Sequence, residues 1–136
     1  MSALTADRNT VSRSGDMLQL DVAAGKVIYK GALVAVDASG NATPGATATT
    51  IRGIGRSDSY ADNSGGAAGD KVVSVSKGVF AYGNSASTDE ITRADIGKDC
   101  YIVDDQTVAK TDGTGTRSIA GQVFDVNSNG VWVKFR

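Results

Sequence analysis

The chain has 136 residues, enough for one domain with a real hydrophobic core, and its 14 basic and 15 acidic side chains leave a net charge of −1. It contains no histidine and a single cysteine, Cys100. This composition excludes a Ser-His-Asp or Cys-His catalytic arrangement, a histidine-ligated metal, an intrachain disulfide and a cysteine zinc cluster. Interspersed charges disfavour a nucleic-acid surface, and short apolar runs disfavour a membrane span. We therefore expect a protein that is not an enzyme and that has no cofactor, nucleic-acid partner or membrane partner.

The first 14 residues show no sustained periodicity and carry few large apolar side chains. We expect residues 1–14 to be an extended N-terminal arm, either disordered or ordered along another subunit. The start of the chain lacks the basic and apolar regions of a secretory signal, which predicts a protein that is not exported by the usual route. Residues 15–136 are expected to form the second region, a β-barrel or β-sandwich domain.

Residues 15–116 alternate short apolar runs with glycine turns, and leucine is rare, which favours many short strands over helices. Residues 42–50, which hold the only proline, and residues 63–70 are interpreted as loops. One short helix is predicted at Thr92–Ile96, with Thr92 and Asp95 as a capping box and Gly97 as its stop. The expected fold is all-β: a small antiparallel β-barrel or sandwich with one short helix and an extended N-terminal arm.

The last twenty residues predict a β-hairpin, with strands over residues 119–126 and 131–135 and a turn over residues 127–130. Asn129-Gly130 tolerates the positive φ angles of a tight hairpin turn. Alternate residues of a strand share a face, so Trp132 is expected opposite the apolar face formed by Val131, Val133 and Phe135. Trp132 is equally well interpreted as core or as a subunit contact.

The motif nearest to a metal site is Asp125-Val126-Asn127-Ser128-Asn129-Gly130, which has the D-x-N-x-N-G spacing of a calcium loop. The twelfth position of such a loop requires a bidentate glutamate, and here it is Arg136. The flanking residues are predicted strands rather than helices. We therefore interpret the motif as a plain hairpin turn.

Other candidate reactive groups have simpler interpretations. Cys100 lies in an apolar strand without a histidine to activate it and is expected to fill the core. Asp104 and Asp105 are neighbours at a strand end, whose side chains point to opposite faces, and are expected to be solvated turn residues. Gly53-Ile54-Gly55 lacks the third glycine of a phosphate loop and predicts a turn or a bulge.

The order of glycine turns and strands over residues 15–136 resembles that of the capsid cement, or head decoration, proteins of tailed bacteriophages and prophages. The segments that carry the resemblance are Gly25-Lys26-Val27, residues 31–36, Gly53-Ile54-Gly55, residues 69–72, Gly78-Val79-Phe80, residues 96–104, residues 120–123 and residues 131–135. It implies a non-catalytic β-rich protein on the outer surface of a phage head, made in the bacterial host cytoplasm. The implied partners are the major capsid protein and further copies of the chain, with a homotrimer favoured over a dimer.

Composition adds a hypothesis about the arm: it becomes ordered along a neighbouring subunit, with Arg8 and Arg13 pairing to carboxylates there. Trp132 is the third expected contact residue. The alternative function is a non-catalytic ligand- or carbohydrate-binding β-module of a virion or fibre. Its stacking platforms would be aromatic side chains: Tyr60, Tyr82, Tyr101 and Trp132.

Overall fold

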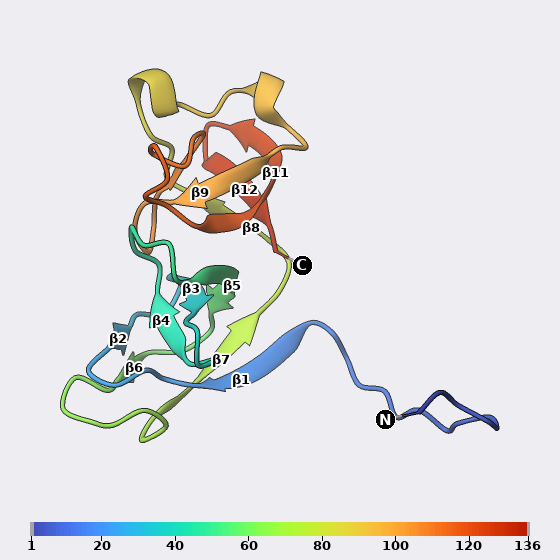
Figure 1. The fold of residues 1–136 in the computed structure, drawn as a ribbon. Helices are drawn as coiled ribbons and strands as arrows, with labels where there is room; N and C mark the ends of the chain where they lie inside the picture. The colour runs from blue at the N-terminus through green and yellow to red at the C-terminus, as the bar shows by residue number, and fades with distance from the viewer. Residues whose placement is uncertain (1, 136) are drawn as a thin grey trace.

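The computed structural model describes residues 2–135 and is nearly all β (Figure 1). In the first half of the chain the strands are β1 (Met17–Asp21), β2 (Val27–Ile28), β3 (Leu33–Val36), β4 (Ala42–Pro44), β5 (Arg52–Ser57), β6 (Ala61–Asp62) and β7 (Val72–Ser76). In the second half they are β8 (Val79–Tyr82), β9 (Asp99–Ile102), β10 (Val108–Ala109), β11 (Ile119–Asn127) and β12 (Gly130–Lys134). Two single turns of 3-10 helix, η1 (Ser87–Asp89) and η2 (Arg93–Asp95), lie between β8 and β9.

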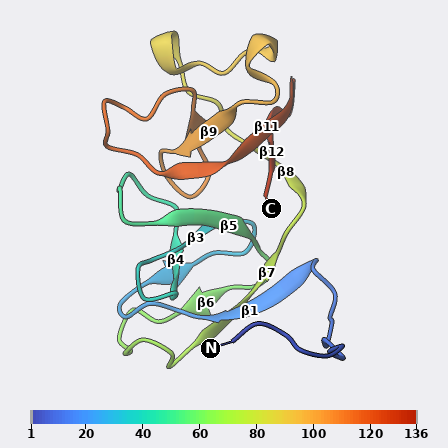
Figure 2. The same cartoon turned by 45° about the vertical axis from the view of Figure 1, so that its right-hand side comes forward.

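The strands form three antiparallel sheets, and the two large ones lie one above the other in Figures 1 and 2. The first sheet has the order β1-β7-β5-β3-β4, the second has the order β10-β9-β11-β12-β8, and β2 pairs with β6. Each large sheet curls until its two edges meet at one isolated parallel bridge, Val22 with Ala42 and Gly83 with Thr107. The edge strands β4 and β10 are too short to extend these bridges into ladders. The sheets therefore do not close into a barrel, and the arrangement is consistent with an all-β sandwich.

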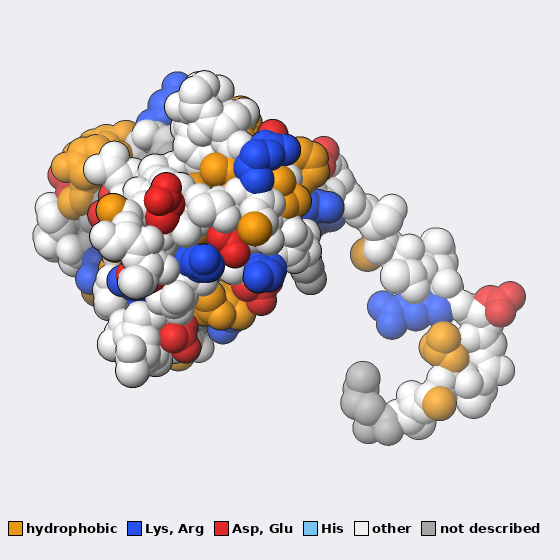
Figure 3. Space-filling view, turned by 90° about the horizontal axis from the view of Figure 1, so that it is seen from above, with side chains coloured by type: hydrophobic (Ala, Val, Ile, Leu, Met, Phe, Trp, Pro, Cys, Tyr) orange, Lys and Arg blue, Asp and Glu red, His pale blue; other side chains and the backbone are white. Residues whose placement is uncertain are grey.

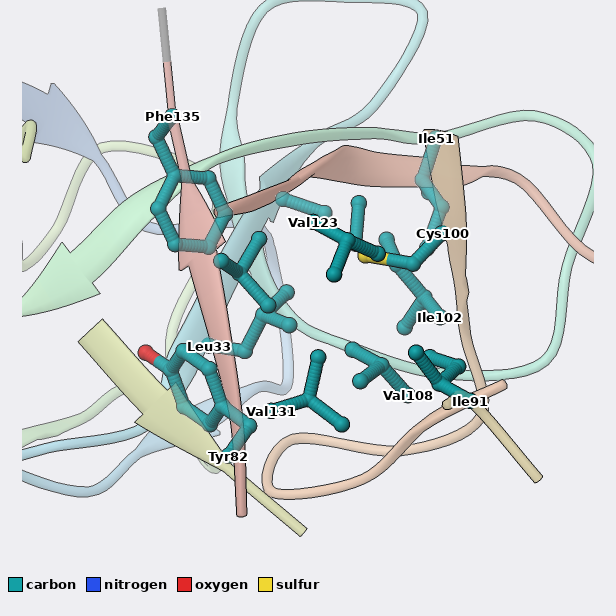
Figure 4. Close-up of a cluster of buried hydrophobic side chains, with 13 residues drawn as sticks. Leu33, Ile51, Tyr82, Ile91, Cys100, Ile102, Val108, Val123, Val131 and Phe135 are labelled. Atoms are coloured by element: carbon teal, nitrogen blue, oxygen red, sulfur yellow. The ribbon is translucent and has the colours of Figure 1, made fainter. Parts of the chain in front are cut away.

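Strand β3 joins the two hydrophobic cores, because both of its faces are buried. Leu33 and Ala35 enter the first core, which is formed mainly by the second sheet. Figure 4 shows the side chains of this core gathered in one cluster. Val34 points the other way, into a second core between the first sheet and the β2-β6 pair. Successive side chains of a strand alternate between faces, so the run Leu-Val-Ala-Val supplies both cores from one strand.

The predicted loop at residues 42–50 is wrong at its start, because Ala42–Pro44 forms β4 and pairs with β3. Composition concealed this strand, since small residues and a proline usually mark a loop. Pro44 is tolerated because β4 is the edge of its sheet, where a missing backbone N–H costs no ladder hydrogen bond. The pairing continues as Gly45 donates its N–H to the carbonyl of Leu33 at 2.8 Å.

The predicted helix at Thr92–Ile96 is a single 3-10 turn rather than an α-helix. The expected capping box is present, and in it the Asp95 carboxylate accepts a hydrogen bond from the Thr92 N–H at 2.9 Å. Gly97 follows with a φ of 93°, as its predicted role as a stop requires. A second turn, η1, was not predicted, because its first residue, Ser87, adopts a φ of 59° that no local pattern indicates.

The predicted C-terminal hairpin is confirmed. Strands β11 and β12 pair from Asn127 opposite Gly130, next to the turn, to Gln122 opposite Lys134. Val131, Val133 and Phe135 are buried on one face, whereas Trp132 is half-buried on the other. The turn differs from the expectation in one detail: Gly130 has a positive φ of 116° but Asn129 does not. The Asn127 carboxamide oxygen accepts the Asn129 N–H at 2.9 Å, and this contact shapes the turn instead.

Candidate interaction surfaces

The N-terminal arm is the most exposed part of the described chain, since every residue from 2 to 17 is solvent-exposed. It leaves the body beside β1 and projects away from it (Figures 1 and 3). Leu4 is 72% exposed and Val11 is 89% exposed, which is unusual for aliphatic side chains of that size. Arg8 and Arg13 lie on this exposed arm. The arm therefore offers both apolar and cationic groups that the chain itself does not cover.

Trp132 lies on the second sheet, whereas the arm leaves the first. It is on the outward face of β12, between Asp125 of β11 and Ala81 of β8. Its indole N–H donates a hydrogen bond to the Asn127 carboxamide oxygen at 3.0 Å. Trp132 is thus attached to the hairpin turn and remains half-buried. The structure does not bring it together with Arg8 or Arg13, which lie on the arm at the first sheet.

The four aromatic side chains expected as stacking platforms do not form one surface. Tyr82 is only 6% exposed, and its ring packs edge-on against Phe135 at a centroid distance of 6.2 Å. Burial raises the pKa of the Tyr82 hydroxyl, which has no hydrogen-bond partner within residues 2–135. Tyr82 is therefore a core residue, and its expected role as a platform is wrong.

The exposed aromatic surface is instead a pair that the sequence did not reveal. The rings of Tyr29 and Tyr60 lie 5.6 Å apart and are 60% and 58% exposed. They come from the ends of β2 and β6, the short strands that pair with each other. Desolvation and the neighbouring Asp62 carboxylate raise the pKa of the Tyr60 hydroxyl. A period-two pattern could not have found this pair, because β2 and β6 have two residues each.

A groove runs between β5, β9 and β11 on the side of the second sheet, lined among others by Arg52, Asp99, Tyr101 and Ile119. Arg117 also lines the groove, and its guanidinium lies 3.3 Å from the Asp89 carboxylate and donates to the Thr111 carbonyl at 3.1 Å. The hydrogen bond from Thr111, with Arg117 beside it, holds the pKa of Asp89 below its usual range. The Asp89 carboxylate and the Arg117 guanidinium therefore stabilise the loop of residues 111–117.

The candidate reactive groups occupy structural positions. Cys100 is fully buried, as expected, and burial raises the pKa of its thiol to about 12. The Asp125 carboxylate of the calcium-like motif already pairs with a cation, because its Oδ1 accepts a hydrogen bond from the Arg93 guanidinium at 2.8 Å. Among residues 2–135, no cluster of three or more histidine, cysteine or acidic side chains is arranged to hold a metal. The motif is a hairpin turn.

Asp95 is the one nearly buried carboxylate in the described chain, at 4% exposure. The backbone hydrogen bond from Thr92 lowers its pKa, and the ammonium groups of Lys110 and Lys98 act in the same direction. Those ammonium groups lie 3.9 Å and 3.8 Å away. This carboxylate anchors η2.

The comparisons with known proteins add no relative: no family model, curated protein or solved structure matches the chain. Within residues 2–135, none of the helical segments has the length and apolar character needed to cross a membrane.

Proposed function

We propose that the protein is a structural capsid decoration, or cement, protein that binds the outer surface of a phage head and reinforces contacts between major capsid subunits. The observation that carries the proposal is the arm, whose residues 2–14 are exposed throughout. A segment with exposed Leu4 and Val11 gains stability when it becomes ordered on another subunit. Neighbouring subunits in a shell provide such a surface at every repeat of the lattice.

The body of the protein suits the same role. The two buried cores are joined through β3, so the arm is attached to one folded body. Copies of this body would bind at the equivalent positions of the capsid lattice. On a lattice, weak contacts made by many copies add through multivalency, so no single strong site is needed. The partners in this proposal are the major capsid protein and further copies of the chain, with a trimer favoured over a dimer.

Three residues are proposed as contacts. Arg8 and Arg13 pair with carboxylates of a neighbouring subunit, since both guanidinium groups lie on the exposed arm. Trp132 contacts a neighbour through the outward face of the second sheet, because a half-buried indole is a common interface anchor.

The test uses heads of the phage or prophage that carries the gene, stripped of this protein and then incubated with purified variants. We expect full-length protein to be retained after gradient purification and a variant lacking residues 2–14 to be lost. Arg8→Ala with Arg13→Ala should reduce occupancy, whereas Thr5→Ala with Ser12→Ala, which removes no charge, should not. Unchanged occupancy of the deletion variant would reject the role of the arm, and no binding by any variant would reject the function.

The alternative of a carbohydrate-binding module is favoured by one observation, the exposed Tyr29–Tyr60 pair. Paired rings can stack on sugar faces. Glycan-array binding that is lost in Tyr60→Ala and kept in Tyr101→Ala would favour this function over cement. Absence of binding to any glycan by the full-length protein would remove it.

A further inference from the structure

Strand β1 leaves one edge of the first sheet open from Met17 to Leu20. The Asp16 carbonyl accepts the Lys77 N–H at 2.8 Å, and the Val22 N–H donates to the Lys71 carbonyl at 2.9 Å. Because alternate residues of an antiparallel strand bond the same neighbour, the peptide groups of Met17, Gln19 and Asp21 face away from β7. Among residues 2–135, no strand pairs with that side from Met17 to Leu20, and β4 meets it only beyond the end of β1, at the bridge between Val22 and Ala42. Such an edge is a template for another extended segment.

The open edge carries negative charges at the spacing at which the arm carries positive ones. Asp16 and Asp21 stand at the two ends of β1, five positions apart, and both are exposed. Arg8 and Arg13 are also five positions apart on the exposed arm. None of these four side chains forms an ion pair within the described residues 2–135.

One antiparallel alignment satisfies both charge pairs at once. Placing Arg8 opposite Asp21 puts Arg13 opposite Asp16, and directly opposite residues share a face of the sheet. The same alignment places Val11 opposite Leu18, whose side chain packs against the second core. The most exposed aliphatic side chain, Val11, would thereby be covered. A hollow runs along this edge, lined by Met17, Leu18, Gln19 and Leu20 of β1 and, on its outer side, by Arg13 of the chain's own arm.

The chain's own arm is poorly placed to fill this edge. The backbone bends at Gly15 and Asp16, and the arm then leads away from the body (Figure 3). The tightest hairpin that could bring the arm back along its own β1 has Ser14 and Gly15 as a two-residue turn. In that hairpin the peptide groups of Asp16 would hydrogen-bond to the arm, but they already face Lys77 of the neighbouring strand. In the structure, arm residues 2–14 do not pair with β1 of the same chain, and we assign this edge to an arm from another molecule.

We propose that arm residues 8–13 of one copy add as an antiparallel strand to β1 of a second copy of this chain, with Arg8 paired to Asp21 and Arg13 paired to Asp16. The main-chain hydrogen bonds supply affinity, and the charge pairs select the alignment. This contact gives the arm a specific neighbour within the proposed function. It requires no head, so its failure in purified protein would leave the head-binding test unaffected.

The test is charge reversal followed by sedimentation velocity on the full-length protein. Arg8→Asp with Arg13→Asp gives a chain whose arm and edge are both negative, and Asp16→Arg with Asp21→Arg gives one whose arm and edge are both positive. We expect each variant alone to self-associate at least about tenfold more weakly than the original chain. An equimolar mixture should restore association, because each arm then meets an edge of opposite charge. Restoration also excludes misfolding as the cause of the loss.

Cross-linking checks the alignment itself. Thr10 and Gln19 lie opposite each other in it, so a Thr10→Cys chain mixed with a Gln19→Cys chain should form an intermolecular disulfide under mild oxidation, and Thr10→Cys mixed with Ser64→Cys should not. The mass of the associated species gives the number of copies that exchange arms. A full-length protein that stays monomeric at all concentrations, or a mixture of reversed variants that fails to associate, would overturn the proposal.

Discussion

Gly53 of β5 passes against the backbone of Ala120 of β11, so closely that a Cβ on Gly53 would lie 2.7 Å from the Ala120 Cα. The two large sheets touch here main chain to main chain, and only glycine allows it. We expect Gly53→Ala to lower the free energy of unfolding by about 1–3 kcal/mol, because the sheets must move apart. Gly65→Ala, which meets no atom within 4 Å, should change it by less than about 0.5 kcal/mol. Equal urea midpoints for the two variants would contradict this close contact.

Strand β3 should make the two cores unfold as one unit. Leu33→Ala, in the first core, and Val34→Ala, in the second, should each destabilise the whole body, by about 2–5 kcal/mol for the leucine. Fluorescence of Trp132 reports on the second sheet, and amide exchange of residues 17–21 reports on the first. Both probes should shift together in both variants. Separate transitions, with each variant affecting one probe alone, would show that the cores are independent.

Asp95 makes stability depend on pH at the acid end of the range. Its folded-state pKa is lowered, so its contribution is present above the unfolded value of 3.8 and is lost as pH falls through the folded value. We expect Asp95→Asn to cost about 1 kcal/mol at neutral pH, the typical worth of a helix cap. The difference from the original chain should shrink below about pH 4. The control is Asp7→Asn in the arm, which makes the same charge change. An Asp95→Asn difference that stays constant with pH would contradict the assignment.

Cys100 should be unreactive in the folded protein. Its side chain is fully buried and its thiol has a pKa of about 12, so almost no thiolate is present at mildly alkaline pH. We expect a thiol reagent to label Cys100 only as the protein unfolds. Ser64→Cys, which adds a thiol in an exposed turn, should gain one rapidly labelled group. Rapid labelling of the original chain in buffer would indicate that the first core opens readily.

The sequence predicted those elements whose pattern is local. The hairpin of residues 119–135 was predictable because its return strand alternates over several residues and Asn129-Gly130 marks the turn before it. The turn at Thr92 was predictable because its cap residues are three apart. The expected irregularity at Gly53-Ile54-Gly55 is also present, as β5 skips Ile54 where it pairs with β3.

What the sequence did not predict depends on contacts between distant segments. Strand β4 exists because β3 offers it a partner, and the Tyr29–Tyr60 pair exists because two-residue strands meet. The open edge of β1 follows from the order of strands in the sheet, which no local pattern encodes. Asn63 shows the same limit: its side-chain amide donates to the carbonyls of Val22 and Ala67, and these buried bonds anchor a segment that composition assigns to a flexible loop.

The double burial of β3 also restricts how the chain can be divided. A cut before Leu33 would remove Val22, Ile28 and Ala32 from the second core. A cut after Val36 would remove β3 itself, and so part of both cores, from the longer fragment. In either case the longer fragment would lack part of its hydrophobic interior. Insertions are better placed in the exposed loop of residues 112–116, where no interior has to be rebuilt.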